Sequence, residues 1–166
     1  MAVMTLSGRL FLAATVIAAL AVAQKKYTGP RPPKPDVPYL LHATNLIETE
    51  TGEAREEKRK DEVANIMRGA NSPARTPLAE PIFLMQAEKL QPERIELYKV
   101  AVKNGNREVS IPSNAKRRRD GPRPLRLSVS RLDGGLYRIE ANQWLDNGEY
   151  CLSPAGSQQV FCFQVY

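Results

Sequence analysis

Apolar and polar residues alternate with a period of two along most of the chain beyond Pro81. This period places successive side chains on opposite faces of a strand, so it predicts half-buried β-strands. Residues 81–87 form a short continuous apolar run, which is typical of a buried strand. Turn signals separate the later alternating stretches. We therefore expect strands and hairpins throughout this part of the chain.

The turn at Asn104-Gly105 sets the register of the first hairpin. A two-residue type I′ turn needs a positive φ at both central residues, which Asn and Gly tolerate. The facing pairs are then Val100 with Val109 and Tyr98 with Ile111. Apolar side chains thus meet on one face, as a half-buried hairpin requires.

The second hairpin favours a longer loop. A two-residue Asp-Gly turn would set Val129 opposite Arg138 and so mix apolar with charged side chains on one face. A three-residue loop, Asp133-Gly134-Gly135 with Gly135 in the left-handed conformation, avoids this conflict. The predicted pairs are Val129 with Ile139 and Leu127 with Ala141.

The third hairpin contains both cysteines of the chain. With Gly156-Ser157 as its loop, one register sets Leu152 opposite Phe161, Tyr150 opposite Phe163, and Cys151 opposite Cys162. We therefore predict a cross-strand disulfide between Cys151 and Cys162. A redox motif would need a C-x-x-C spacing, which is absent. Two Cys and one His are also too few for a structural zinc site, so no metal site is expected.

The pattern is less regular between Tyr39 and Gly69. Residues 39–47 predict one strand, and the segment 48–62 has 11 charged residues in 15. Glu56 and Lys60 would form a favourable i,i+4 pair in a helix, and the residues that follow provide a narrow apolar stripe. We favour a short helix near 53–68. The alternative is a pair of polar strands that extends to a loop tip.

The stretch Asp146-Asn147-Gly148-Glu149-Tyr150 resembles the tyrosine corner of immunoglobulin-like domains, with Asp146, Gly148 and Tyr150 as its structural residues. The family places its inter-sheet cysteine two residues after the tyrosine, where this chain has Leu152. Together with the strand pattern, the resemblance implies an all-β, immunoglobulin-like antiparallel β-sandwich of about 7–8 strands. It implies no activity. Trp144 is expected to fill the core beside this corner.

The N-terminus has the features of a secretory signal peptide. Arg9 is followed by fourteen residues, 10–23, that contain no polar group larger than Thr15, and they end in Ala21-Val22-Ala23. Fourteen residues are too few for an ordinary membrane span, so we expect cleavage after residue 23 rather than an uncleaved anchor. A Pro-rich lead-in, 24–38, then precedes one domain, 39–166. The chain is expected to be exported from a bacterium, to the periplasm or beyond, where disulfides persist.

The strongest charge feature is a basic loop, residues 112–124, between two predicted strands. The basic residues of the loop, together with Arg126 just after it, are Lys116, Arg117, Arg118, Arg119, Arg123 and Arg126. Guanidinium groups suit phosphate and sulfate oxygens, so these residues are candidates for binding a polyanion such as a lipid head group or an acidic glycan. The alternative is a solvated loop that keeps the protein soluble. Nothing indicates sequence-specific nucleic-acid binding.

No catalytic constellation is visible in the sequence. The single histidine, His42, lies in a strand pattern and is expected to be structural, and no cofactor motif is present. The chain is therefore expected to be a non-enzymatic binding module of the cell envelope, with an envelope protein or a polyanion as its partner. A structural subunit of an envelope assembly is the alternative, and an enzyme of unknown type ranks third.

Overall fold

The computed structural model describes residues 26–114 and 121–166, which fold almost entirely into β-strands. In chain order the elements are β1 (Tyr39–His42), β2 (Asn45–Glu48), β3 (Glu50–Glu53), β4 (Arg55–Lys58), β5 (Glu62–Met67), β6 (Arg75–Thr76), β7 (Ile82–Gln86), the 3₁₀ turn η1 (Pro92–Arg94), β8 (Ile95–Lys103), β9 (Asn106–Pro112), β10 (Leu127–Asp133), β11 (Leu136–Ala141), β12 (Gly148–Pro154) and β13 (Gln159–Val165). The all-β prediction is confirmed. The described residues form thirteen strands, several of them very short, against the 7–8 expected.

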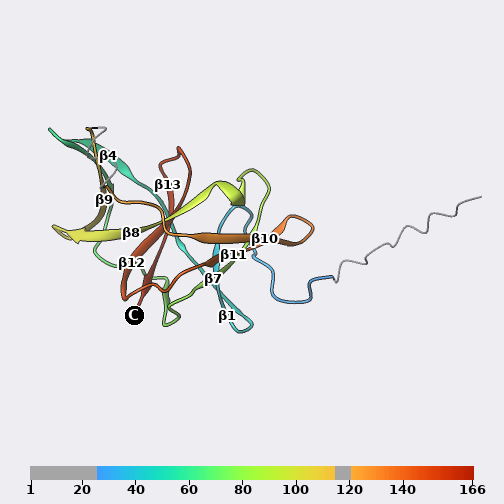
Figure 1. Ribbon diagram of the computed structural model, residues 1–166. Helices are drawn as coiled ribbons and strands as arrows, with labels where there is room; N and C mark the ends of the chain where they lie inside the picture. The colour runs from blue at the N-terminus through green and yellow to red at the C-terminus, as the bar shows by residue number, and fades with distance from the viewer. Residues whose placement is uncertain (1–25, 115–120) are drawn as a thin grey trace, which may run out of the picture.

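The strands form two antiparallel sheets that pack as a β-sandwich (Figure 1). One sheet has the order β10-β11-β7-β1-β2, and the other has the order β3-β13-β12-β8-β9-β5-β4. The short strand β6 pairs in parallel with β13 at the side of the second sheet. The predicted sandwich is therefore confirmed.

The sandwich core lies between the two sheets and consists of large apolar side chains. Its fully buried members include Leu40, Phe83 and Ile139 from the five-stranded sheet, and Leu97, Leu152 and Phe163 from the other. Phe163 packs edge-on against Phe83 at a ring-centroid distance of 5.0 Å and stacks with Tyr150 at 5.7 Å. These contacts hold the inner faces of the two sheets together.

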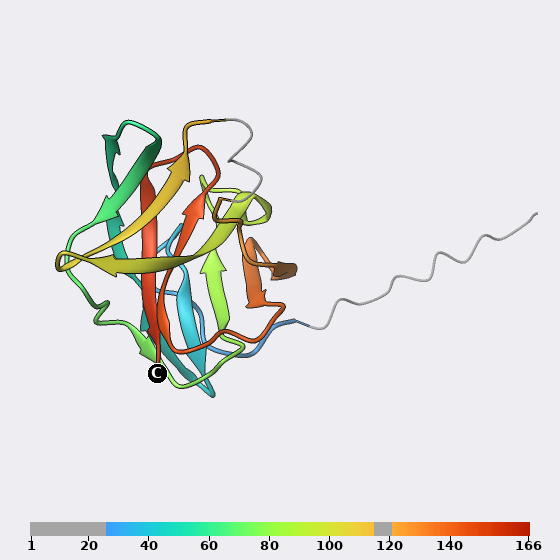
Figure 2. The same cartoon turned by 60° about the vertical axis from the view of Figure 1, so that its left-hand side comes forward.

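The larger sheet closes on itself into a small barrel. Strands β3 and β4 are two halves of one extended run, Glu50–Lys58, with Ala54 between them. The β3 half pairs with β13, whereas the β4 half pairs with β5. One run therefore joins the two ends of the strand order, and Figure 2 shows the sheet curling round toward itself. This closure creates a second interior, on the face of β8, β12 and β13 that points away from the sandwich core.

The prediction of a short helix near 53–68 is wrong, because this segment forms the strand pair β4 and β5. The polar strand pair considered as the alternative is what the chain adopts. Arg59, at the tip of this pair, forms ion pairs with Glu57, Glu62 and Glu108, and the last of these lies on the neighbouring strand β9. Arg59 and Lys103 lower the pKa of Glu108 to about 2. Cross-strand pairing thus takes the place of the helical i,i+4 pair.

Both faces of β5 are buried near its end, which also excludes a helix with one narrow apolar stripe. Ala64 and Ile66 are buried on one face, and Met67 is buried on the other. The single strand expected at 39–47 is likewise two strands, β1 and β2, which form a hairpin. Ala43 has a φ of 54° in the turn between them. Positive φ values are uncommon for alanine, so the sequence did not indicate a turn at this position.

The registers of the three hairpins agree with those predicted, with local differences. In the β8–β9 hairpin, Asn104 and Gly105 have positive φ values as expected. The paired residues end at Ala101 and Glu108, so the next predicted pair, Val100 with Val109, lies where the strands part. The cystine hairpin pairs Cys151 with Cys162 as predicted.

The β10–β11 hairpin has the predicted facing pairs but a shorter loop. Val129 faces Ile139 and Leu127 faces Ala141. Asp133 pairs with Leu136, so only two glycines remain in the loop, and the extra residue forms a β-bulge between Arg131 and Asp133. Both the bulge and the three-residue loop displace the register by one residue, which explains why the pairing was predicted correctly.

The tyrosine-corner stretch has a clear geometry. The Tyr150 hydroxyl donates a hydrogen bond of 2.7 Å to the carbonyl oxygen of Asp146, and its ring is buried in the sandwich core. Trp144 does not fill the core as expected, because 73% of its surface is exposed. Leu145 occupies the buried position beside the corner instead.

The lead-in packs on the sandwich from about Pro32 onward. Pro32 is buried, and the amide of Asp36 bonds to the carbonyl of Gln86 on β7. The Asp36 carboxylate accepts hydrogen bonds from the amides of Glu88, Lys89 and Leu90, and these bonds outweigh partial burial and lower its pKa.

Within the described residues, no helix is long and apolar enough to cross a membrane.

Candidate ligand site in the barrel wall

The barrel interior is lined mainly by small side chains. Its buried members include Ala54, Val100, Cys151, Val160 and Cys162, and Met67 is the largest apolar side chain among them. The disulfide between Cys151 and Cys162 crosses from β12 to β13 inside the barrel, so the predicted bond is present. Small side chains on the inner face leave space that larger ones would fill.

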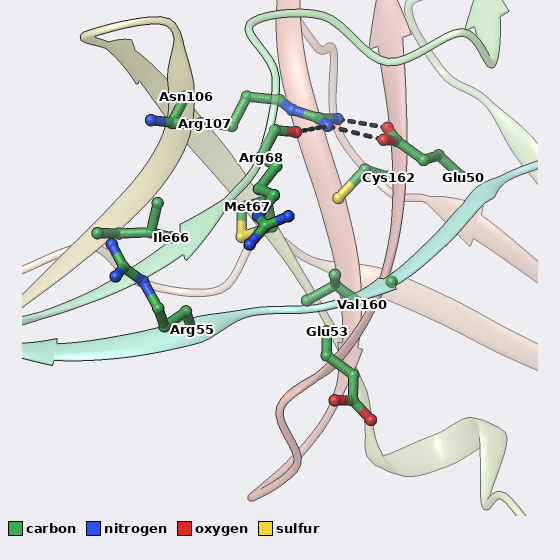
Figure 3. A pocket seen from close by; sticks show the side chains of 11 residues that line it. Glu50, Glu53, Arg55, Ile66, Met67, Arg68, Asn106, Arg107, Val160 and Cys162 are labelled. Carbon is green, nitrogen blue, oxygen red and sulfur yellow. Dashed lines mark hydrogen bonds and ion pairs between the residues drawn. The ribbon is translucent and has the colours of Figure 1, made fainter.

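The barrel wall is open between β3 and the end of β5. Arg55 and Ile66 form the last pair of the β4–β5 ladder, and beyond them β3 turns to β13 while β5 stays with β9. The resulting cavity has a volume of about 610 Å³. We call it the wall cleft, and its lining includes Glu50, Glu53, Arg55, Met67, Arg68 and Arg107 (Figure 3).

A buried arginine forms one side of the wall cleft. Arg107 is only 1% exposed, and its guanidinium donates two hydrogen bonds to the Glu50 carboxylate, at 2.6 and 2.9 Å. It also donates to the carbonyl oxygens of Arg68 and Gly69, as Figure 3 shows for Arg68. The bidentate geometry holds the two strands across the opening. Arg107 is thus fully engaged and unsuited to direct ligand binding.

Glu149 lies behind Arg107 and completes the buried ionic cluster. It is 4% exposed, and one of its carboxylate oxygens is 3.7 Å from the Arg107 guanidinium and accepts a hydrogen bond from the amide of Ser72. Its other oxygen, Oε1, has no hydrogen-bond partner among the described residues. Burial raises the pKa of Glu149. The cluster therefore holds one guanidinium, which is buried, against two carboxylates, of which Glu149 is buried and Glu50 is partly exposed.

The rim of the wall cleft carries charged groups that are available to a ligand. The guanidinium of Arg68 has no hydrogen bond or ion pair with any residue of the described chain. Among the described residues, the guanidinium of Arg55 has one weak contact, 3.4 Å to Glu57, and it is well exposed. Glu53 also lines the cleft, and its carboxylate has no partner among the described residues. Two guanidinium groups against one carboxylate favour an anionic ligand group.

A second cavity, of about 230 Å³, adjoins the wall cleft, and the two share Met67 and Val160 in their linings. We call it the inner pocket, and its lining is mostly apolar, with Ala54, Tyr98, Val100, Val109, Ile111 and Cys151 among its residues. It forms where β8 and β9 part after the last pair of their ladder. Tyr98 donates a hydrogen bond to Glu96 at its mouth, and burial, followed by this bond, raises the pKa of Tyr98.

The sequence-based candidates lie elsewhere. Lys116, Arg117, Arg118 and Arg119 are outside the described residues. Arg123 and Arg126 are exposed, on either side of Leu125, whose amide bonds to the carbonyl of Leu97 on β8. Neither of these two arginines lines the wall cleft or the inner pocket. His42 contacts the Thr76 hydroxyl at 2.8 Å, which suits the structural role predicted for it.

The residues of the wall cleft were missed from the sequence. Arg107 follows a hairpin turn and Arg55 lies in a run of mixed charge, so both read as ordinary solvated residues. Arg68 follows the buried end of β5, and only its neighbour Gly69, with a φ of 82°, marks the end of that strand. No local signal distinguishes these arginines from the others, because barrel closure is what brings them together.

The described residues include no group of three or more His, Cys, Asp or Glu side chains that could hold a metal ion. Comparisons with models of protein families, with curated proteins and with solved structures found no match for this chain.

Proposed function

We propose that this chain is an exported, non-enzymatic binding module of the cell envelope that holds the anionic group of a small ligand in the wall cleft. The observation that carries the proposal is the open cavity of about 610 Å³, whose rim includes Arg68, a residue whose guanidinium has no partner among the described residues. Arg55 lines the same cavity, so two guanidinium groups can bind one carboxylate or phosphate from two sides. The ion pair of Arg107 and Glu50 joins β9 to β3 at the side of the same cleft.

The proposed location is supported by two features. The first 23 residues have the pattern of a cleavable secretory signal, and the described chain contains a disulfide. Disulfides persist in the periplasm and outside the cell. The hydrogen bond between Tyr150 and Asp146 supports an immunoglobulin-like origin for the sandwich, and this fold hosts many binding functions.

The test is calorimetric titration of the oxidised protein with inorganic phosphate and with a short carboxylate such as butanoate. We expect weak, saturable binding that Arg68→Gln reduces about tenfold or more, because a charge-assisted contact is lost. Arg131→Gln is the matched control, because Arg131 is an exposed arginine on β10 that does not line the cleft. Equal binding by Arg68→Gln and by the wild type would refute the proposal.

A second candidate function is the contact with a polyanion through the basic loop 112–124. The net charge of +6 and the exposed position of Arg123 and Arg126 support it. Binding would release counterions, so retention on a heparin or anionic-lipid support should fall steeply with salt. Replacing Arg117, Arg118 and Arg119 by Ser should lower the salt concentration at elution. Co-elution of this triple variant with the wild type would leave the loop as a solvated connector.

A structural subunit of an envelope assembly remains the alternative to a binding module. It predicts stoichiometric co-purification with envelope proteins after cross-linking of the native exported chain. A binding module predicts instead that the chain is recovered without a fixed protein partner. An enzyme of unknown type ranks behind both, because no described group of residues supplies a catalytic constellation.

A further inference from the structure

The wall cleft and the inner pocket are adjoining parts of one barrel interior. Met67 and Val160 line both cavities, so these two side chains form the partition between them. The two ends of the disulfide lie on opposite sides of this partition. Cys162 lines the wall cleft, and Cys151 lines the inner pocket. The lining therefore changes from the charged rim of the wall cleft to the mostly apolar inner pocket, which Asn65, Glu96 and Gln158 also line.

We infer that the ligand is an anionic amphiphile, with its anionic head at Arg55 and Arg68 and its apolar chain passing Met67 into the inner pocket. This inference rests on the proposed function and names the ligand class of the same site. Charge complementarity places the head at the rim, where Arg68 has no partner among the described residues. The apolar lining of the inner pocket, which includes Ala54, Val100 and Val109, suits a chain of methylene groups.

The partition can open at low cost. Met67 has an unbranched side chain with three rotatable bonds, so it can move aside without a change in the backbone. Val160 is small, and the glycine opposite it on β3, Gly52, leaves space beside the partition. An alkyl chain that displaced Met67 would pass along the end of β5, where Ile66 and Met67 line the wall cleft and Asn65 and Met67 line the inner pocket. A narrow passage between two side chains suits a linear chain better than a compact ring system.

The test is a chain-length series, measured by calorimetry on delipidated, oxidised protein below the micelle concentration of each probe. The probes are straight-chain carboxylates from butanoate to hexadecanoate, and the matching alkyl phosphates show which head group is preferred. Each methylene buried in the inner pocket should tighten binding about three- to fourfold until the pocket is full. The heat capacity change should become more negative with chain length, as apolar burial requires.

Two variants test where the alkyl chain of the ligand lies within the barrel. Ala54→Leu fills part of the inner pocket and leaves the rim of the wall cleft unchanged, so it should abolish the gain from chain length while butanoate still binds. Val102→Leu is the matched control, because Val102 is exposed on β8 and lines neither cavity. If Ala54→Leu does not fold, the series on the wild type still decides, since it needs no variant.

The possible failures are distinguishable. Equal affinity for butanoate and for dodecanoate would overturn the amphiphile inference and leave the proposed anion site intact. Binding of neither, at any chain length, would overturn both. Equal affinity for dodecylamine and for dodecanoate would show that the site does not distinguish a cationic from an anionic head group, and this would refute the inference. An unchanged chain-length gain in Ala54→Leu would place the chain outside the inner pocket and so refute the inference.

Discussion

Strand β13 presents Phe161 and Phe163 to the sandwich core, and Val160 and Cys162 to the barrel interior. The sandwich core is filled by large side chains in direct contact, whereas the barrel interior has small side chains, an ionic cluster and two cavities. The same strand thus stabilises the fold with one face and leaves space with the other. Cavities on one face of β13 are thus compatible with a stable fold, because the sandwich core on the other face is packed independently of them.

The sharpest test of this contrast compares truncations on the two faces of β13. Phe163→Ala should lower the free energy of unfolding by about 3–5 kcal/mol, because it removes a fully buried ring that packs against two others. Val160→Ala should cost less than about 2 kcal/mol, because Val160 already borders two cavities. Urea unfolding of both variants measures the difference. Similar costs would mean that the two interiors are packed equally well.

Removal of the disulfide has the next largest expected effect. The double variant Cys151→Ala/Cys162→Ala should lose about 3 kcal/mol, because the cross-link closes a loop of roughly 12 residues in the unfolded chain. Hydrogen exchange should increase more in β5, which faces the barrel interior, than in β7 of the five-stranded sheet. A uniform increase would contradict the separation of the two interiors. Two free thiols in the exported protein, found by non-reducing peptide mapping, would contradict the bond itself.

The tyrosine corner should contribute less. Tyr150→Phe should cost about 1 kcal/mol, because only the hydrogen bond to the Asp146 carbonyl is lost. Tyr150→Ala should cost several times more, because the ring also leaves the sandwich core. Thermal unfolding of the two variants provides the comparison. Equal costs would show that the hydroxyl, and not the ring, determines the role of Tyr150.

The smallest effect is expected at Glu149 and concerns pH. Its folded pKa is raised by burial above the ordinary value of 4.5, so the folded state binds this proton more tightly than the unfolded state does. Its contribution to stability is therefore full below pH 4.5 and declines as the pH rises through the folded pKa. Glu149→Gln should flatten this decline and slightly increase stability at pH 7. A loss of several kcal/mol at pH 7 would instead identify Glu149 as an essential counter-ion of Arg107.

The fold could be predicted where local chemistry determines it. Asn104-Gly105 determined one hairpin, and the cysteine pairing followed from the same alternation that placed Tyr150 opposite Phe163. The segment 53–68 was assigned wrongly because its charges fit an i,i+4 pattern as well as a cross-strand one. Tertiary contacts decide between the two, among them the ladder of β5 with β9 and the ion pair of Arg59 with Glu108. Trp144 was misplaced because aromatic residues are usually buried, while its neighbour Leu145 occupies the core.

The wall cleft could not be predicted because it depends on contacts between distant segments. Arg107 on β9 meets Glu50 on β3 only after the run Glu50–Lys58 has joined both sides of the sheet. Nothing near Ala54 in the sequence marks the point where pairing changes from β13 to β5. Closure thus buries the Arg107 guanidinium against the partly exposed Glu50 carboxylate, and sequence patterns that extend over a few residues do not contain that information.

The pairing of β3 with β13 also has a consequence for the time course of folding. These strands lie near opposite ends of the described chain, so the barrel closes only after a long stretch of polypeptide has become available. Contacts between residues so far apart in the sequence slow folding. The chain loses conformational entropy when the long loop closes, before the contacts can stabilise it. We therefore expect the β10–β11 hairpin to gain protection early in refolding and the β3–β13 ladder to gain it last. Until then Cys162 stays accessible, so the disulfide can still form after the first strands have paired.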